Sequence, residues 1–431
     1  MSTKPVDAAI QARDRGTPLI DYLRSRGYVQ DISDERGLAE AFASGPVTAY
    51  VGFDPTAASL HVGHLLSIMM LGTIQRFGHR PIALAGGGTT MVGDPTGKTA
   101  TRKVLSLDEI QVNLQTVIRQ FDRYIDFRGG RFDDHNPAAL LVNNADWLLQ
   151  LKYIEFLRDI GRHFSVNEML AAETYKVRLE SSGLNFVEFN YRIVQAYDFL
   201  YLYRTVGCRL QMGGSDQWGN IVAGVDLIRR VEGGQAFALV TPLITTSSGQ
   251  KMGKSEGNSL WLDPEMTSPF DYYQYWINVD DSDVRRLLYF YTFLPAEQID
   301  DLTSVSGESL RDAKRTLAYE STALTHGIAA AEEAKAAATR LFSGSGANNL
   351  DPADHTLPTV AIEPADGLTI ADLFVQAGLA SSRGDARRTA SQGGLSIGNE
   401  RVTDVDQLVS GSAPLILRAG KKRFMRVIFN G

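Results

Sequence analysis

Two short segments of the chain carry side chains suited to holding phosphate groups. The first places His61 and His64 around Gly63, directly after a strand-like run and at the expected start of a helix. A helix start presents free N–H groups and the positive end of the helix dipole, which attract anions. Gly63 admits a flat ligand to the backbone, and two imidazoles one turn apart can donate to phosphate oxygens. A surface pair or half of a metal site is the alternative, but no cysteine or carboxylate cluster accompanies the pair, so a metal site is not expected.

The second segment places Lys251 and Lys254 on either side of Gly253, within a polar loop over residues 245–257. Two lysines on a mobile loop can close over a triphosphate and stabilise the charge that develops as pyrophosphate leaves. Taken alone, this signal is weak, because basic loops that contain glycine are usually just solvated.

A third segment, residues 93–99, superficially resembles a phosphate-binding P-loop. The pattern fails because Val92 stands where glycine is required and Pro95 interrupts the backbone cradle. Asp94 is better interpreted as a fixed carboxylate at the cleft, able to bind an amino group.

A polar stripe is expected on one later helix. Tyr191, Gln195 and Asp198 fall at positions i, i+4 and i+7 inside an otherwise apolar stretch, so they share one helical face. Buried polar groups need partners, which a bound ligand or a structural network can supply. The polar segment 211–220 follows and carries Asp216 and Gln217.

The elements that must position these residues form a strand–helix–strand unit. Residues 47–53 are β-branched and aromatic and end in Asp54-Pro55; apolar residues at helical spacing follow from Val62, and a second apolar run covers 81–84. This order is typical of a parallel sheet, in which ligands bind beyond the carboxyl ends of the strands. Further strands are expected over 209–214 and 237–244, and residues 107–203 are expected to be mostly helical.

Composition sets the broad class of the protein. The 431 residues are 44% hydrophobic, enough for a core in each of two to four domains at about 100–200 residues per domain. The single cysteine, Cys208, excludes an internal disulfide and suggests a reducing compartment. The N-terminal residues lack the apolar stretch of a secretion signal, and no apolar run reaches the ~18 residues of a membrane helix. A cytoplasmic protein with no membrane partner is therefore expected.

Net charge is informative only when it is divided along the chain. The total of -7 argues against a nucleic-acid partner. However, residues 368–431 carry a net charge of +4, and residues 1–367 carry -11. A Ser-, Gly-, Asp- and Pro-rich stretch over 343–367 is the best candidate linker between these two parts.

Taken in order, these segments resemble the class I aminoacyl-tRNA synthetases. Residues 61–64 and 251–255 resemble the two signatures of that class, and residues 50–54, 93–98, 195–198 and 213–220 are similar to the bacterial tyrosyl-tRNA synthetases in particular. Two positions depart from the usual pattern. Val62 replaces isoleucine and keeps β-branching, whereas Gly253 replaces serine, so any role of that hydroxyl is not transferred.

The resemblance implies a reaction in two steps. ATP and L-tyrosine form tyrosyl-adenylate, and the tyrosyl group then moves to the 3′ end of tRNA(Tyr). ATP is a substrate accompanied by Mg²⁺, no protein-ligated metal is implied, and no editing domain is expected. By similarity, the catalytic residues are His61, His64, Lys251 and Lys254; the tyrosine-binding residues are Tyr50 and Asp198 at the phenol and Asp94, Tyr191 and Gln195 at the amino group; and ATP is bound by Asp54, Gly63, His61, His64, Asp216, Gln217 and Lys254.

The same resemblance divides the chain into domains. An N-terminal helical segment (1–45) precedes a Rossmann-like parallel-sheet catalytic domain (46–265), a helical anticodon-binding domain (266–342), the linker (343–367) and a C-terminal S4-like α+β RNA-binding domain (368–431). The family implies a homodimer. The aromatic residues of the helical domain are interpreted mainly as core. The expected RNA-binding residues are Arg383, Arg387, Arg388, Lys421 and Lys422.

Three other interpretations stay open from sequence. A non-synthetase nucleotidyltransferase shares the histidine signature but needs neither the lysine loop nor the C-terminal RNA-binding unit. A tryptophanyl enzyme has no use for Tyr50 and Asp198, because an indole carries no hydroxyl. A non-catalytic RNA-binding protein does not account for intact histidines and lysines.

Overall fold

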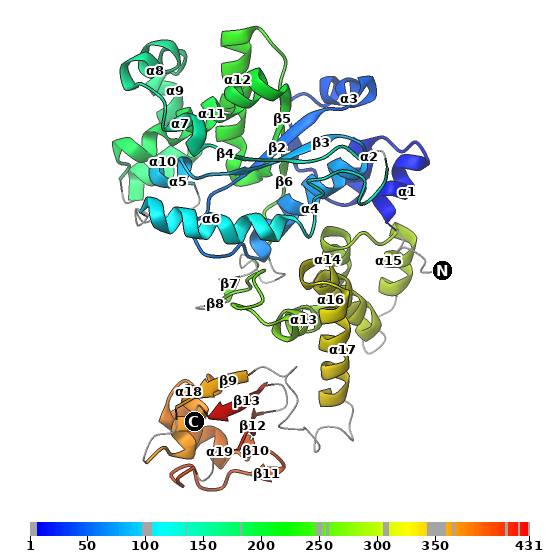
Figure 1. Ribbon diagram of the computed structural model, residues 1–431, viewed down its shortest axis with the longest axis vertical. Helices are drawn as coiled ribbons and strands as arrows, with labels where there is room; N and C mark the ends of the chain where they lie inside the picture. The colour runs from blue at the N-terminus through cyan, green and yellow to red at the C-terminus, as the bar shows by residue number, and fades with distance from the viewer. Residues whose placement is uncertain are drawn as a thin grey trace. The chain divides into compact units, whose positions relative to one another are not determined.

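The fold is taken from a computed structural model. It describes residues 7–96, 106–134, 136–181, 183–245, 247, 252, 254–255, 258–304, 310–342, 359–363, 367–409, 413–420 and 423–429. Contacts divide the chain into two compact units (Figure 1). The first comprises residues 1–267 and 279–325, and the second comprises residues 268–278 and 326–431.

A six-stranded sheet forms the centre of the first unit. Its order is β1-β6-β5-β2-β3-β4, with every neighbouring pair parallel except β1 and β6. Strands β2, β3, β5 and β6 are almost entirely buried, as expected for parallel strands covered on both faces. The strands are β1 (Asp31–Ile32), β2 (Thr48–Phe53), β3 (Arg80–Ala85), β4 (Leu140–Asn143), β5 (Cys208–Gly214) and β6 (Phe237–Thr241).

Helices connect the parallel strands by crossovers. The chain leaves β2 toward β3 and β4 on one side of the sheet and returns through β5 and β6 on the other. The strand order therefore reverses between β2 and β5, and a crevice is expected at the carboxyl ends of these two strands. The crossover helices are α4 (Val62–Arg76), α6 (Leu107–Phe121), α11 (Phe186–Val206) and α12 (Trp218–Glu232).

Helix α4 is apolar on nearly every side, and its residues from Ile68 to Arg76 are all buried. Its N-terminus is closed by a capping box in which His61 and His64 take the two side-chain roles. Glycine at position 78, with φ of 86°, ends the turn that follows the helix and leads into β3. The helix thus runs from the candidate phosphate site at one end to a polar network at the other.

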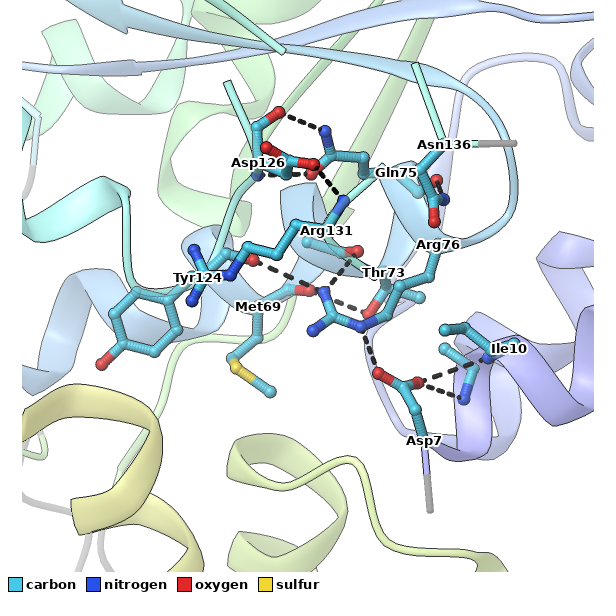
Figure 2. A network of polar contacts seen from close by, with 12 residues as sticks. Asp7, Ile10, Met69, Thr73, Gln75, Arg76, Tyr124, Asp126, Arg131 and Asn136 are labelled. Carbon is cyan, nitrogen blue, oxygen red and sulfur yellow. Dashed lines mark hydrogen bonds and ion pairs between the residues drawn. The ribbon is translucent and has the colours of Figure 1, made fainter. Parts of the chain in front are cut away.

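That network surrounds a buried guanidinium (Figure 2). Arg76 is 3% exposed; its Nε donates to Asp7 at 2.5 Å and its Nη1 donates to the carbonyl of Gly72 at 3.0 Å. The guanidinium also lies 3.7 Å from the ring centroid of Phe132 and 3.8 Å from that of Phe293. Asp7 itself caps helix α1, so its carboxylate links the N-terminal segment to α4.

The described part of the expected helical segment over 1–45, residues 7–45, contains three helices and also strand β1, which adds to the edge of the sheet at β6. Its helices are α1 (Ala8–Asp14), α2 (Leu19–Ser25) and α3 (Glu35–Ser44). Shorter elements of the first unit are α5 (Thr89–Val92), α7 (Ala145–Leu148), α8 (Tyr153–Asp159), η1 (Gly161–His163), α9 (Val166–Ala171), α10 (Glu173–Ser181), η2 (Ser215–Gln217), β7 (Lys254–Ser255), β8 (Asn258–Ser259), η3 (Asp281–Asp283), α14 (Val284–Tyr291) and α15 (Ala296–Thr303).

The second unit combines several helices with a five-stranded sheet. Its helices include α13 (Pro269–Ile277) and α17 (Ile328–Phe342). Helix α16 (Arg311–His326) belongs to the first unit except for its last residue, His326. The sheet has the order β11-β10-β12-β13-β9. Its elements are β9 (Thr359–Ile362), α18 (Ile370–Gln376), α19 (Arg383–Ser391), β10 (Leu395–Ile397), β11 (Glu400–Arg401), β12 (Leu415–Ala419) and β13 (Arg423–Phe429).

Three features differ from the expected organisation. Residues 107–203 contain strand β4 as well as helices. Strand β9 lies inside the expected linker and pairs with β13. The expected helical domain over 266–342 contributes to both compact units. The first two differences share a cause, since β4 and β9 each form by pairing with a strand far away in the sequence.

The aromatic residues of the helical segments are mainly core, as expected. Those buried are Phe270, Tyr272, Tyr273, Trp276, Phe290 and Tyr291. Among the described residues, no helix is long and apolar enough to cross a membrane.

Candidate active site

The crevice at the carboxyl ends of β2 and β5 contains a pocket of about 320 Å³. Its walls include the expected residues from five separate segments of the sequence, which the fold brings together. Those lining it are Tyr50, Asp54, His61, Gly63, His64, Asp94, Tyr191, Gln195, Asp198, Asp216 and Gln217.

Tyr50 and Asp198 form the deep end of this pocket. Tyr50 is 1% exposed and Asp198 is 2% exposed. The Tyr50 ring packs edge-on against Phe199, with 5.4 Å between ring centroids. Burial, reinforced by the nearby Asp198 carboxylate, raises the pKa of Tyr50 well above its ordinary value. Tyr50 is therefore a neutral phenol throughout the physiological range.

The Asp198 carboxylate is held by two donors that the sequence did not reveal. Asn144 Nδ2 donates to Asp198 at 2.9 Å, and Trp147 Nε1 donates at 2.7 Å. Burial raises the pKa of Asp198 to about 7, even though both hydrogen bonds act in the opposite direction. Asn144 and Trp147 thus aim a carboxylate that is easily protonated into the pocket.

Several buried polar atoms around this carboxylate lack a hydrogen-bond partner within the described part of the chain. They are Tyr50 OH, Gln195 Oε1 and Gln211 Oε1. Gln211 lies on β5 and is 2% exposed. Buried polar atoms without partners cost free energy, so such a concentration in one pocket indicates a polar ligand that completes the hydrogen bonds.

Besides Asp198 and Asp216, the pocket carries the carboxylates of Asp54 and Asp94. Asp54 accepts hydrogen bonds from Thr89 Oγ1 at 2.7 Å and from Tyr191 OH at 3.0 Å. Asp94, 8% exposed, accepts from Gln217 Nε2 at 2.8 Å. Each carboxylate is therefore fixed in direction by a neighbouring segment, as expected for groups that position a substrate.

The two histidines are preorganised at the N-terminus of α4. His61 Nδ1 accepts from the N–H of Gly63 at 3.0 Å, and His64 Nδ1 accepts from the N–H of His61 at 3.2 Å. Because Nδ1 is the acceptor in both rings, the hydrogen-bond pattern assigns the proton of each neutral imidazole to Nε2. Both rings are thereby arranged as donors to an anion.

Gly63 is required by its close contact with His61. A Cβ atom at this position would lie 2.7 Å from His61 Cε1, well inside the normal contact distance. Any larger side chain would therefore displace the imidazole, which explains the glycine between the two histidines.

The segment that follows the lysine loop is hydrogen-bonded to the same helix start. Val62 N–H donates to the carbonyl of Leu260 at 3.0 Å, and Leu262 N–H donates to Leu60 at 2.9 Å. Trp261 packs edge-on against His61, with 5.9 Å between ring centroids. The end of the loop is thus attached directly to the histidine segment.

The lysines themselves are only partly described. Lys251 and Gly253 lie outside the described residues. Lys254 is placed by its backbone alone, in strand β7, which pairs with β8. Met252 is buried and lines the pocket beside Gly63, so the loop segment approaches the histidines.

In the C-terminal sheet domain, the three expected arginines of α19 are each paired with a carboxylate. Arg383 binds Asp372; Arg387 binds Asp406 at 2.6 Å; and Arg388 binds Asp385 at 2.7 Å. Their side chains stay 57–71% exposed. Lys421 and Lys422 lie outside the described residues.

Two family descriptions match the chain. The tRNA synthetases class I (W and Y) match residues 43–343, and the tyrosine--tRNA ligase SYY-like C-terminal domain matches residues 350–427. The tyrosine--tRNA ligase of Desulfosudis oleivorans is 49% identical over 434 residues, covering 95% of this chain and 98% of that protein. The chain belongs to the bacterial tyrosyl-tRNA synthetases. The tyrosine--tRNA ligase of Clostridium kluyveri is 48% identical and covers the same shares of each chain.

Solved structures agree with this membership. The chain is similar to a C-terminally truncated mitochondrial tyrosyl-tRNA synthetase of Aspergillus nidulans, with a TM-score of 0.68 and 32% identity over 77% of this chain and 97% of that one. A tryptophanyl-tRNA synthetase from Encephalitozoon cuniculi has a TM-score of 0.54 at 14% identity, over 79% of this chain and 94% of that one, and so shares the fold alone. The expected fold class, enzyme class and tyrosine--tRNA ligase activity are confirmed.

Proposed function

We propose that the deep pocket binds the phenol of L-tyrosine between Tyr50 and Asp198. The observation that carries this proposal is the cluster of buried polar atoms without partners around an aimed carboxylate. A phenol O–H donates to Asp198 and accepts from Tyr50, which satisfies both groups at once. A phenylalanine ring leaves both unsatisfied, and a discrimination of about 10⁵ against it is established for tyrosyl-tRNA synthetases, the family of this chain.

The α-amino group of tyrosine is then held by Asp94, Tyr191 and Gln195. Asp94 supplies the negative charge, and Gln195 Oε1 supplies an acceptor that has no partner among the described residues. Charge-assisted hydrogen bonds to a fixed carboxylate orient the amino acid strongly. The substrate carboxylate is thereby directed toward the histidine end of the pocket.

ATP is proposed to lie with its phosphates at the N-terminus of α4. His61, His64 and the backbone at Gly63 hold the phosphates, while Asp54, Asp216 and Gln217 contact the ribose or the amino-acid backbone. A carboxylate oxygen of tyrosine attacks the α-phosphorus, the bond to the bridging oxygen of the β-phosphate breaks, and pyrophosphate leaves. No protein nucleophile is needed, so catalysis consists of positioning and charge stabilisation.

Lys251 and Lys254 are assigned to the departing pyrophosphate, where their charge matters most in the transition state. Mg²⁺ accompanies ATP in this proposal, with phosphate oxygens among its ligands. The tyrosyl group then moves from the adenylate to the 3′ end of tRNA(Tyr). Arg383, Arg387 and Arg388, together with Lys421 and Lys422, are proposed to contact the tRNA; exposed ion pairs such as those of α19 are weak enough to exchange for phosphate.

We further propose a cytoplasmic homodimer. Among the described residues, the large hydrophobic side chains that are exposed lie mostly between positions 149 and 187 of the sequence. A second copy of the chain that covered them would remove this apolar surface from water. Those most exposed there are Ile154 (72%), Phe186 (66%) and Tyr153 (61%). A mass of two chains by light scattering is expected, and a shift toward one chain is expected in Ile154→Glu.

ATP–pyrophosphate exchange with tyrosine, phenylalanine and tryptophan tests the activation step. We expect exchange with tyrosine and at most a trace with the other two. Exchange with tryptophan at a comparable kcat/KM would contradict the assignment of Tyr50 and Asp198.

A further inference from the structure

The C-terminal sheet has two faces of different character. The face toward α18 and α19 is apolar and includes Leu395, Leu417 and Val427 in one core cluster. Because side chains alternate along a strand, the residues next to these three in each strand point to the opposite face. That second face carries Arg401, Arg418 and Arg426.

A row of paired residues crosses the second face. Arg401 on β11 is opposite Ser396 on β10, and Ser396 is opposite Arg418 on β12. Directly opposed residues share a face, so the two guanidinium groups lie on one side of the sheet with only a serine between them. Their Cα atoms are separated by two strand spacings, roughly 10 Å.

On the next strand, β13, the row continues with Phe424, which other side chains cover. Arg418 is opposite Phe424, which is 8% exposed. Phe424 and Ile416 form a cluster with Phe270 of α13 and Ala337 of α17. The two helices therefore cover the β12–β13 side of this face, whereas Arg401 is exposed and Arg418 is half-exposed.

The two arginines differ from those of α19 in their neighbours. Within the described residues, neither Arg401 nor Arg418 has an ion-pair partner, whereas each of the three α19 arginines has one. The described strand residues on this face include no carboxylate; Glu400 is opposite Ile397, on the other face. Arg426 adds a third guanidinium to the same face, opposite Ile416.

We propose that Arg401 and Arg418 form a docking row for the sugar–phosphate backbone of the tRNA substrate. Uncompensated guanidinium groups bind phosphate oxygens through two parallel hydrogen bonds, and they need not first give up a carboxylate. The α19 arginines must exchange an existing partner for each phosphate. The row therefore provides the larger share of the charge-dependent affinity in this part of the chain. The inference rests on the proposed transfer to tRNA.

The test is the salt dependence of tRNA(Tyr) binding by the full-length protein. Dissociation constants for the unmodified transcript are measured between about 50 and 300 mM salt for wild type, Arg401→Gln, Arg418→Gln and the double variant. Loss of two phosphate contacts should lower the slope of log Kd against log salt by about 1.4 to 1.8. Each single variant should weaken binding about tenfold at low salt.

The matched comparison is the double variant Arg387→Gln with Arg388→Gln. It removes the same two positive charges, but these two arginines are ion-paired in the wild-type protein. This pair should change the slope by less than the Arg401 and Arg418 pair. The control is Arg36→Gln, an exposed arginine paired with Glu40 in α3, and it should change nothing. A slope unchanged in the Arg401 and Arg418 double variant, or a larger effect of the α19 pair, overturns the inference.

Pyrophosphate exchange with tyrosine separates this result from the proposed function. Exchange should be unchanged in every variant, because none of the altered residues lines the pocket. Absence of tRNA charging by the wild-type protein would instead contradict the proposed function. Normal charging and binding by the double variant would overturn the inference about the row and leave the proposed function intact.

Discussion

Replacing Asp198 by asparagine removes the ionisable group of the deep pocket while preserving its shape. The amide oxygen can still accept from Asn144 or Trp147, but the amide cannot carry a negative charge. The substitution therefore isolates the consequence of burying a carboxylate whose pKa is about 7. It affects both the stability of the free protein and the activation of tyrosine.

The effect on stability has a definite sign. The pKa of Asp198 is higher in the folded protein than in the unfolded chain, where it is near 3.8. The contribution of Asp198 to the free energy of unfolding is therefore complete below about pH 4, and it is lost as the pH rises through 7. A difference of about three pKa units corresponds to roughly 4 kcal/mol, since each unit is about 1.4 kcal/mol. The free energy of unfolding of Asp198→Asn relative to wild type should rise by up to this amount between pH 4 and 8.

Urea denaturation of the protein without tyrosine, followed by tryptophan fluorescence at several pH values, measures this difference. In the same variant, kcat/KM for tyrosine in pyrophosphate exchange should fall about 10- to 150-fold, because a hydrogen bond to a charged acceptor contributes about 1.5–3 kcal/mol. KM for ATP should change little. A stability difference that is flat across the pH range would refute the buried, proton-binding carboxylate, and unchanged tyrosine activation would refute its role at the phenol.

Three other substitutions test separate parts of the structure. In Gly63→Ala, the added methyl group displaces the His61 ring, so stopped-flow measurements should show slower adenylate formation with tyrosine affinity unchanged; a wild-type rate would contradict the close contact. Lys254→Ala should likewise reduce the rate of adenylate formation and leave tyrosine binding nearly intact, whereas equal losses in both would show that the loop does not act selectively in the transition state. Arg178→Met removes one partner of a buried ion pair, with 2.9 Å between Arg178 Nη2 and Glu188 Oε2, and should lower the free energy of unfolding by about 3–5 kcal/mol in urea denaturation, with part of the loss recovered when Glu188→Gln is added. A loss below about 1 kcal/mol in the single variant would indicate that the pair is solvated.

The sequence predicts the core of the site well where the signal is local. The strand ending at Phe53 and the helix beginning at Val62 follow from strong apolar patterns on both sides of a turn. The polar stripe of α11 follows from helical spacing alone, and its three residues do meet in the pocket. Patterns within about ten residues of one another were therefore sufficient for these elements.

The sequence could not predict the partners that come from distant strands. Strand β4 has only four residues and a mixed burial pattern, so no periodicity identifies it. Asn144 and Trp147 follow it directly and reach Asp198 across 54 and 51 residues of sequence. Only the parallel pairing of β4 with β3 brings them to the pocket. Two carboxylate partners of the α19 arginines, Asp372 in α18 and Asp406, lie 11 and 19 residues away from Arg383 and Arg387, and they come close only when the C-terminal unit folds.

The carboxylate of Asp7 has a practical consequence for handling this protein. It is the acidic partner of Arg76, whose guanidinium is buried beneath the N-terminal segment (Figure 2). Deleting the first helices in order to shorten an expression product would leave a positive charge inside the fold, at the end of the helix whose other end holds the histidines. Loss of activity in such a product would then report damage to α4 rather than a catalytic role of the deleted residues. The substitution Asp7→Asn in the full-length chain removes the same carboxylate and deletes no helix, so it distinguishes the two.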